Sequence, residues 1–155
     1  MAVRPIPEGY HSLTPYLVLH NAAEALEFYK KAFGAVEVMR MDGPDGRVMH
    51  AEIKIGDSHV MLGDECPQGG YKSPKSLGGA GVSLMFYVEG VDAAFARAVQ
   101  AGAAVQRPVT DMFWGNRCGT IADPFGHVWT IATHVEDVSF EECKRRAEDF
   151  MKKAG

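Results

Sequence analysis

The sequence predicts an α+β fold in which two βαβββ modules follow one another within a single domain of 155 residues. Each half reads as a strand, an amphipathic helix and then two or three further strands. A glycine stops the helix in both halves. A shift of 68 positions also aligns several pairs of like residues, namely Gly34-Ala35 with Gly102-Ala103, Ile53 with Ile121, and His59-Val60 with His127-Val128.

The first module is expected to span about residues 12–64, beginning with a strand over 12–20. Asn21 is a suitable N-cap, and Glu24 three residues later completes a capping box. Apolar residues then recur at helical spacing as far as Gly34, whose left-handed conformation ends the helix. Turn residues punctuate the remaining strands, which are expected over 36–40, 47–55 and 59–63, with a hairpin at 41–46.

The second module is expected over about residues 81–134, with a strand at 81–89 and a helix that ends at Gly102. Asp123-Pro-Phe-Gly126 makes a turn into the last strand, 127–133. Residues 65–80, rich in glycine, proline, serine and lysine, form an exposed linker between the modules. An amphipathic helix is expected over 139–153, with one apolar stripe that packs on the domain or on a partner subunit.

Composition excludes several classes of function. The net charge of −4 and the pI near 5.8 leave no basic surplus to neutralise nucleic-acid phosphates. The chain has no apolar run long enough to span a bilayer, and its first nine residues lack the apolar core of a signal peptide. The cysteines, Cys66, Cys118 and Cys143, are odd in number and widely spaced, which favours free thiols and a cytoplasmic location.

His50 and Glu52 are the candidate catalytic residues. In the strand 47–55, alternation places Met49, Ala51, Ile53 and Ile55 on an apolar face that packs under the helices, and Val48, His50, Glu52 and Lys54 on the other. An imidazole and a carboxylate two residues apart on one strand face are close enough to share a proton, a water or a displaced metal. A solvated strand face is the alternative interpretation, and Lys54 is consistent with it.

Arg117, Phe113 and Trp114 are the candidate ligand-binding residues. An arginine clamps a carboxylate or phosphonate bidentately, and the neighbouring rings stack on a planar ligand. A structural arginine at an interface or turn explains Arg117 equally well. Tyr16, Phe86 and Trp129 lie on predicted strands and are expected to pack in the core.

The order of elements resembles the vicinal oxygen chelate superfamily, which includes glyoxalase I, bleomycin resistance proteins and extradiol dioxygenases. Several strings resemble its PhnB-like branch, over roughly residues 12–142. The most specific are Gly115-Asn116-Arg117 and the run from Asp123 to His134, supported by 14–17, 27–35 and 50–52. The resemblance implies curved sheets with helices on the convex side, a ligand cavity on the concave side, and pairing into homodimers.

The metal-dependent members of that superfamily take His and Glu ligands from the first and last strand of each module. Carried onto this sequence, those positions fall near Thr14, Met61 (or Leu62), Ser83 and Thr130. None of them is a histidine or a carboxylate, the donors that such a divalent cation needs. We therefore expect no metal at the usual site, while a metal at a shifted site stays open.

Two functions compete on this basis. The first is a lyase or isomerase that binds a small polar or aromatic molecule in a dimer cavity and uses His50 and Glu52 for proton transfer. The second is a non-catalytic protein that sequesters a small molecule of antibiotic type. Some relatives in this branch are called methyltransferases, but the chain has no glycine-rich Rossmann turn to hold a methyl-donor nucleotide. We reject that activity.

Overall fold

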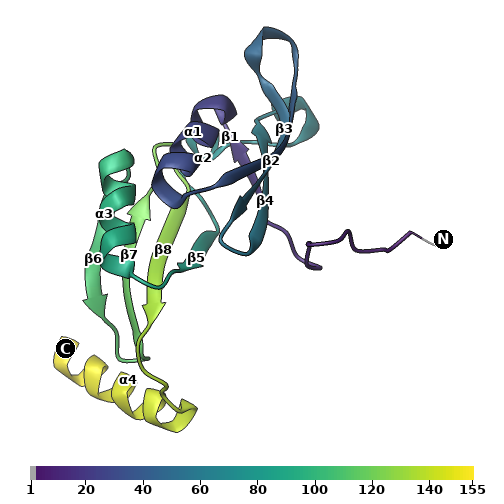
Figure 1. The fold of residues 1–155 in the computed structure, drawn as a ribbon. Helices are drawn as coiled ribbons and strands as arrows, with labels where there is room; N and C mark the ends of the chain where they lie inside the picture. The colour runs from purple at the N-terminus through teal and green to yellow at the C-terminus, as the bar shows by residue number, and fades with distance from the viewer. Residues whose placement is uncertain (1–2) are drawn as a thin grey trace.

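The computed structural model describes residues 3–155 and contains two four-stranded mixed sheets, each with one helix against one face (Figure 1). Module 1 consists of β1 (Tyr16–Leu19), α1 (Ala22–Phe33), β2 (Val36–Asp42), η1 (Pro44–Gly46), β3 (Val48–Ile55) and β4 (Ser58–Asp64). Module 2 consists of β5 (Ser83–Tyr87), α3 (Val91–Ala101), β6 (Ala104–Asp111), β7 (Asn116–Ala122) and β8 (Val128–His134). The predicted fold class is confirmed.

The two sheets have the same topology, with strand orders β1-β4-β3-β2 and β5-β8-β7-β6. The first strand of each module runs parallel to its last, and the other pairs are antiparallel. The predicted alignment of His59-Val60 with His127-Val128 is wrong by one residue. Four residues separate the paired Lys54 and His59, whereas five separate the paired Ala122 and Val128. The longer turn shifts β8, so that Trp129 occupies the buried position that Val60 occupies in β4.

Local sequence explains where the first helix starts and stops. The side chain of Asn21 accepts a hydrogen bond from the backbone N–H of Glu24, as a capping residue does. Gly34 has φ of +67°, and its N–H bonds to the carbonyl of Lys30. Both features agree with the sequence prediction, and they set the direction in which the chain enters β2.

The helix-bearing sides of both sheets meet in one core, where α1 lies beside α3 (Figure 1). Phe33 of α1 packs on Trp129 of β8, with ring centroids 4.6 Å apart. The buried carboxylate of Asp123 accepts hydrogen bonds from the Tyr29 hydroxyl (2.7 Å) and the Trp129 indole (2.9 Å). It also accepts the backbone N–H groups of Phe125 and His127. The turn before β8 therefore fastens module 2 to the helix of module 1, and the opposite faces of the sheets stay open.

We expect this core to make the protein sensitive to alkali. Burial, followed by the nearby Asp123 charge, raises the pKa of Tyr29 well above its ordinary value of 10.0. An acid whose pKa is higher in the folded state stabilises the fold below its unfolded pKa, and this contribution is lost as pH rises above about 10. Alkaline unfolding followed by circular dichroism should show that loss of stability. Its slope should be smaller in Tyr29→Phe, and equal slopes in the two proteins would contradict the assignment.

Two further segments lie outside the sheets. The predicted linker contains η2 (Pro67–Gly69) and α2 (Pro74–Leu77), and the Glu65 carboxylate holds it through the N–H of Ser73 and the hydroxyl of Ser76. The C-terminal helix α4 (Phe140–Ala154) lies beyond the end of module 2 (Figure 1). In residues 3–155 no helix is long and apolar enough to cross a membrane.

Candidate functional site

The open face of β3 presents His50 and Glu52, as the strand period predicts. Ala51, Ile53 and Ile55 are buried on the helix side. The start of the strand departs from the predicted pattern, because Val48 is fully buried whereas Met49 is 66% exposed. The cause is a shift in the pairing of β2 with β3 between Met41 and Asp42, which reverses the alternation before His50.

His50 and Glu52 belong to a chain of four polar side chains. His50 Nε2 lies 3.1 Å from Glu52 Oε1, and His50 Nδ1 lies 3.3 Å from the Tyr16 hydroxyl. Tyr10, in the segment before β1, donates its hydroxyl to Glu52 Oε2. An ionised carboxylate only accepts, so in neutral His50 the proton sits on Nε2 and the lone pair of Nδ1 faces Tyr16.

This arrangement suits proton transfer. Glu52 is only 8% exposed, so its charge is held near the imidazole with little screening by water. A carboxylate in this position can orient the ring and can stabilise an imidazolium formed when Nδ1 takes up a proton, as the aspartate of a serine-protease triad does. Burial raises the pKa of Tyr16 above 10.0, with a further contribution from Tyr71, so its hydroxyl is a proton donor at neutral pH.

Tyr10 and Tyr16 were missed or misplaced by sequence reasoning. Tyr16 is 43% exposed on the open face and does not pack in the core, whereas Trp129 is buried and Phe86 packs against the core, as predicted. The signal for Tyr16 was available, because β1 alternates and Leu17 and Leu19 are its buried residues. Tyr10 comes from an irregular segment and reaches the site by stacking on His59 at 4.1 Å, which no local pattern indicates.

The structure does not bring Arg117 to His50 and Glu52. Arg117 lies on the helix side of β7, where its guanidinium binds Asp92 at the start of α3 (2.8 Å) and Asp111 of β6 (3.1 Å). Hydrogen bonds to Asp92 and then Asp111 raise the pKa of this guanidinium. Within one chain these contacts match the structural interpretation of Arg117.

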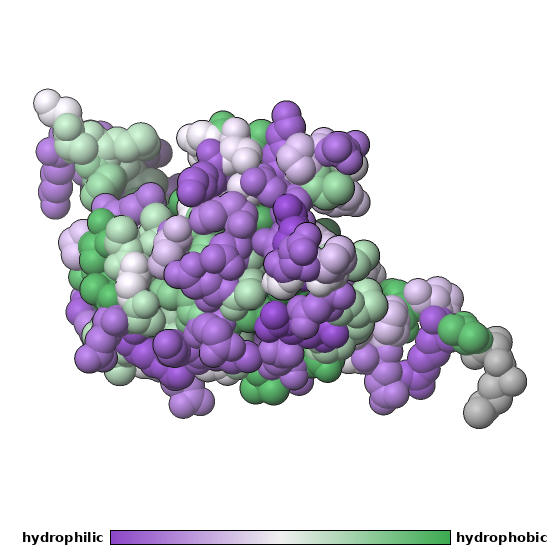
Figure 2. Space-filling model, turned by 90° about the horizontal axis from the view of Figure 1, so that it is seen from above, coloured by the Kyte–Doolittle hydropathy of each residue, from purple (hydrophilic) through white to green (hydrophobic). Residues whose placement is uncertain are grey.

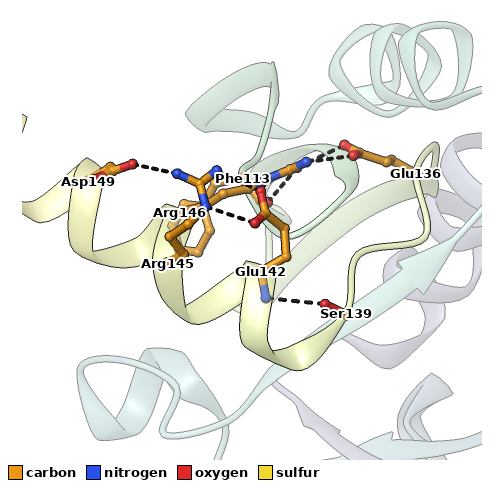
Figure 3. Close-up of polar contacts among 7 residues, drawn as sticks. All are labelled: Phe113, Glu136, Ser139, Glu142, Arg145, Arg146 and Asp149. Atoms are coloured by element: carbon orange, nitrogen blue, oxygen red, sulfur yellow. Dashed lines mark hydrogen bonds and ion pairs between the residues drawn. The ribbon is translucent and has the colours of Figure 1, made fainter.

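Phe113 and Trp114 form an edge-to-face pair at the β6–β7 loop, with ring centroids 4.9 Å apart. Helix α4 holds this loop, since the Phe150 and Phe113 ring centroids lie 5.5 Å apart. Arg146 also donates to the Phe113 carbonyl oxygen (Figure 3). Arg146 also binds Glu136 and Glu142. Hydrogen bonds from Arg145 and then Arg146 lower the pKa of Glu142 to about 2. Within one chain the loop therefore lies at the end of the molecule away from β3 (Figure 1).

A pocket of about 470 Å³ opens between the two modules. His11 and His59 line one side, and Met85, Tyr87 and Trp129 line the other. His50 and Glu52 are not among its lining residues. One lining residue, His59, stacks on Tyr10, whose hydroxyl donates to Glu52.

The residues at the family's usual metal positions do not suit a divalent cation. Met61 of β4 alternates with the buried Val60 and Leu62, and Thr130 of β8 with the buried Trp129 and Ile131, so both face the open sides. Neither is a histidine or a carboxylate. In the described part of the chain, no three His, Cys, Asp or Glu side chains group so as to hold a metal ion. We derive no chemical step through a metal.

Protein purified without added metal or chelator is expected to contain well under one divalent metal ion per chain. The donor set argues for this result, because thioether and hydroxyl groups bind zinc, nickel and iron poorly compared with imidazole and carboxylate. Elemental analysis is the direct measurement. Glyoxalase I activity should be negligible for the same reason, since that reaction needs a metal to polarise the substrate oxygens. One metal per chain, bound by residues of the first and last strands, would contradict the expectation.

Comparison with known proteins identifies the family. The model of the Glyoxalase/Bleomycin resistance protein/Dioxygenase superfamily matches residues 12–131. The chain belongs to this superfamily. It is 46% identical over 136 residues to the uncharacterized protein Mb0911c of Mycobacterium bovis, covering 86% of this chain and 90% of that one.

Solved structures agree on the fold. The Arabidopsis thaliana gene product At5g48480 superposes with a TM-score of 0.66 at 30% identity, covering 79% of this chain and 98% of the other. TioX from Micromonospora sp. ML1 superposes with a TM-score of 0.64 at 22% identity, covering 83% of this chain and all of that one. The second similarity is one of fold alone.

Proposed function

We propose that this protein is a PhnB-like member of the superfamily that catalyses proton transfer on a small polar or aromatic molecule, as a lyase or isomerase. The observation that carries the proposal is the chain of contacts Glu52–His50–Tyr16 on the open face of module 1. A histidine oriented by a buried carboxylate, with its other nitrogen free to accept, is the usual form of a general base.

The proposed chemistry uses His50 as base and Tyr16 as acid. A substrate oxygen breaks the long 3.3 Å hydrogen bond between Tyr16 and His50 and accepts a hydrogen bond from the Tyr16 hydroxyl in its place. Nδ1 of His50 then removes a proton from the carbon next to the substrate carbonyl, giving an imidazolium paired with Glu52 and an enolate held by Tyr16. If the substrate has a double bond conjugated with the enolate, return of the proton to the far carbon of that dienolate is an isomerisation. If the carbon beyond the enolate carries a leaving group, the bond to that group breaks, the group departs with the electron pair, and the reaction is an elimination.

We infer that the working unit is a homodimer. The open faces carry large apolar side chains, with Met85 50% and Tyr87 57% exposed, and β1 and β5 each pair with one strand only. Figure 2 shows apolar residues exposed among polar ones on the surface seen from above. A second copy that covers these faces would turn the open sheet of module 1 into a cavity. Sedimentation equilibrium should then give twice the 16.9 kDa of one chain.

Exchange of substrate hydrogen with D₂O tests the proposed reaction. A panel of 2-oxo acids, hydroxyketones and carbonyl phosphonates is incubated with the protein in D₂O, and loss of the proton beside the carbonyl is followed by NMR. We expect at least one compound to exchange faster than without protein, and Glu52→Gln to slow that exchange by roughly 10- to 100-fold by removing the charge that supports His50. Exchange at the background rate for every compound would contradict proton transfer.

The alternative function is sequestration of a small molecule without turnover, and the methionines of the open face favour it. Met39 and Met41 of β2 pair with Glu52 and His50 across the sheet, and Met61 of β4 pairs with Glu52 on the other side. Methionine-rich surfaces adapt to ligands of varied shape. Ligand-induced rise of the melting temperature with no exchange would support this function. We propose a cytoplasmic location, which the free cysteines support.

A further inference from the structure

Arg107 on β6 differs from the other arginines of the sheets in having no acidic partner. Arg117 and Arg40 are both paired with aspartates, whereas no ion pair within residues 3–155 involves Arg107. Among residues 3–155, the hydrogen bonds of its Nη2 group go only to the Cys118 sulfur at 3.8 Å and the Thr120 hydroxyl at 3.3 Å. A thiol and a hydroxyl are weak acceptors for a guanidinium that carries five N–H donors.

The position of Arg107 places it on the open face of module 2. A methyl group added at Gly119 would collide with the Phe95 ring of α3, so Gly119 faces the helix. Its neighbours Cys118 and Thr120 therefore face the opposite way, and the hydroxyl of Thr120 lies 3.0 Å from that of Thr130. Arg107 extends over these two residues of β7, and it lies on the opposite side of the sheet from Arg117.

The internal repeat relates Arg107 to the proposed catalytic pair. In module 2, Arg107 of β6 pairs with Thr120 of β7, and in module 1 the equivalent pair is Met39 of β2 with Glu52 of β3. Both pairs lie next to a register shift in the edge strand. Cys118 is likewise the counterpart of His50. At the positions of His50 and Glu52, module 2 thus carries Cys118 and Thr120, and the guanidinium of Arg107 extends over these two residues.

We propose that Arg107 binds the anionic group of the ligand, which we infer to be a small molecule bearing a carboxylate or a phosphonate. A guanidinium binds two oxygens of such a group in parallel, and Thr120 and Thr130 supply hydroxyls at the same place. In the proposed dimer, Arg107 of one wall holds the anion while His50 of the other wall meets the reacting carbon. The net charge of the chain is −4, so the protein as a whole does not attract anions, and anion binding would have to come from a local cationic site such as Arg107.

This inference rests on the proposed function only for the link to His50, and its test is independent of turnover. Benzoate and phenylphosphonate are titrated into ¹⁵N-labelled full-length protein, with neutral benzamide as the matched control. The arginine side-chain Nε–H signals and the backbone signals of β7 report the site. We expect saturable shifts of the Arg107 and Cys118 signals with both anions and none with benzamide.

Variants decide which arginine is responsible. Arg107→Ala should weaken benzoate binding by about tenfold or more, the usual effect of losing a charged hydrogen bond, and Arg107→Lys by less. Arg117→Ala, on the other face of the same sheet, should bind benzoate as the wild type does. Circular dichroism confirms that each variant is folded. Unchanged binding in Arg107→Ala, equal binding of benzamide, or no saturable shift with either anion overturns the proposal.

His50→Ala separates the two proposals. It should keep benzoate binding within about twofold, because the charged hydrogen bonds that hold the carboxylate come from Arg107, while losing the exchange reaction. Anion binding at Arg107 without any exchange reaction would leave this inference standing and remove the proposed function. Exchange that depends on His50, without anion binding at Arg107, would do the reverse.

Discussion

Replacing Asp123 with alanine is expected to lower the free energy of unfolding by about 3–5 kcal/mol, because several buried donors would lose their acceptor at about 1–3 kcal/mol each. The carboxylate is buried and accepts four hydrogen bonds, two from the side chains of Tyr29 and Trp129 and two from backbone N–H groups. Alanine would leave these donors without an acceptor inside the core. Urea denaturation followed by tryptophan fluorescence measures the change.

Asp149→Ala is the matched control, because that carboxylate lies on the exposed face of α4 and pairs with Arg145 at 3.0 Å. Exposed ion pairs contribute little, so this variant should unfold close to the wild-type midpoint. Asp123→Asn should also be destabilised, since an amide offers a single acceptor oxygen where the carboxylate has two. If Asp123→Ala were as stable as Asp149→Ala, the turn before β8 would not be what holds the modules together.

His50→Ala and Ile53→Ala are expected to separate function from stability. His50→Ala should reduce the rate of the exchange reaction by roughly 10²- to 10⁴-fold, the usual contribution of a general base. Its stability should fall by only about 1–2 kcal/mol, because the variant loses two partly exposed hydrogen bonds and little packing. Ile53 is fully buried on the other face of β3, and its truncation should cost about 2–5 kcal/mol with the rate per folded molecule unchanged.

The two variants control for each other, because they lie three positions apart on one strand with their side chains on opposite faces. Rates are normalised to the folded fraction from the unfolding curves. A His50→Ala protein that unfolds at room temperature, with normal exchange by the fraction that remains folded, would make His50 a structural residue. The assignment of the site to the open face of module 1 would then be wrong.

The order of the elements was predictable from the chain because its signals are local. Asn21 caps α1 through a bond three residues away, and Gly34 ends that helix with its own backbone conformation. The two-residue period of β3 likewise placed His50 with Glu52 on one face, since successive side chains of a strand point to opposite sides. These features depend on residues close together in sequence, so a sequence pattern predicts them.

The internal repeat was predictable in outline, but the predicted register of β8 was wrong, because the prediction relied on local sequence alone. Matching the two halves at one fixed shift works for β3 and β7, but the turn before β8 is one residue longer than its counterpart. The pattern of burial then decides the register, because Trp129 fills the core position that Val60 fills in module 1. The unpredicted exposure of Met49 has a similar origin, in the shifted pairing of β3 with β2.

Which side chains meet was decided by tertiary structure alone. Tyr10 reaches Glu52 across 42 positions of the chain, and Asp123 reaches Tyr29 across 94. The sequence pointed to Arg117 and not to Arg107 as the ligand-binding arginine. Only the direction of β7 relative to α3 shows that Arg117 pairs with Asp92 while Arg107 faces outward. By itself the sequence determined the elements, the strand face of His50 and the family resemblance. Contacts between distant segments required the folded chain, because they arise from the packing of whole elements and leave no periodic trace in any one of them.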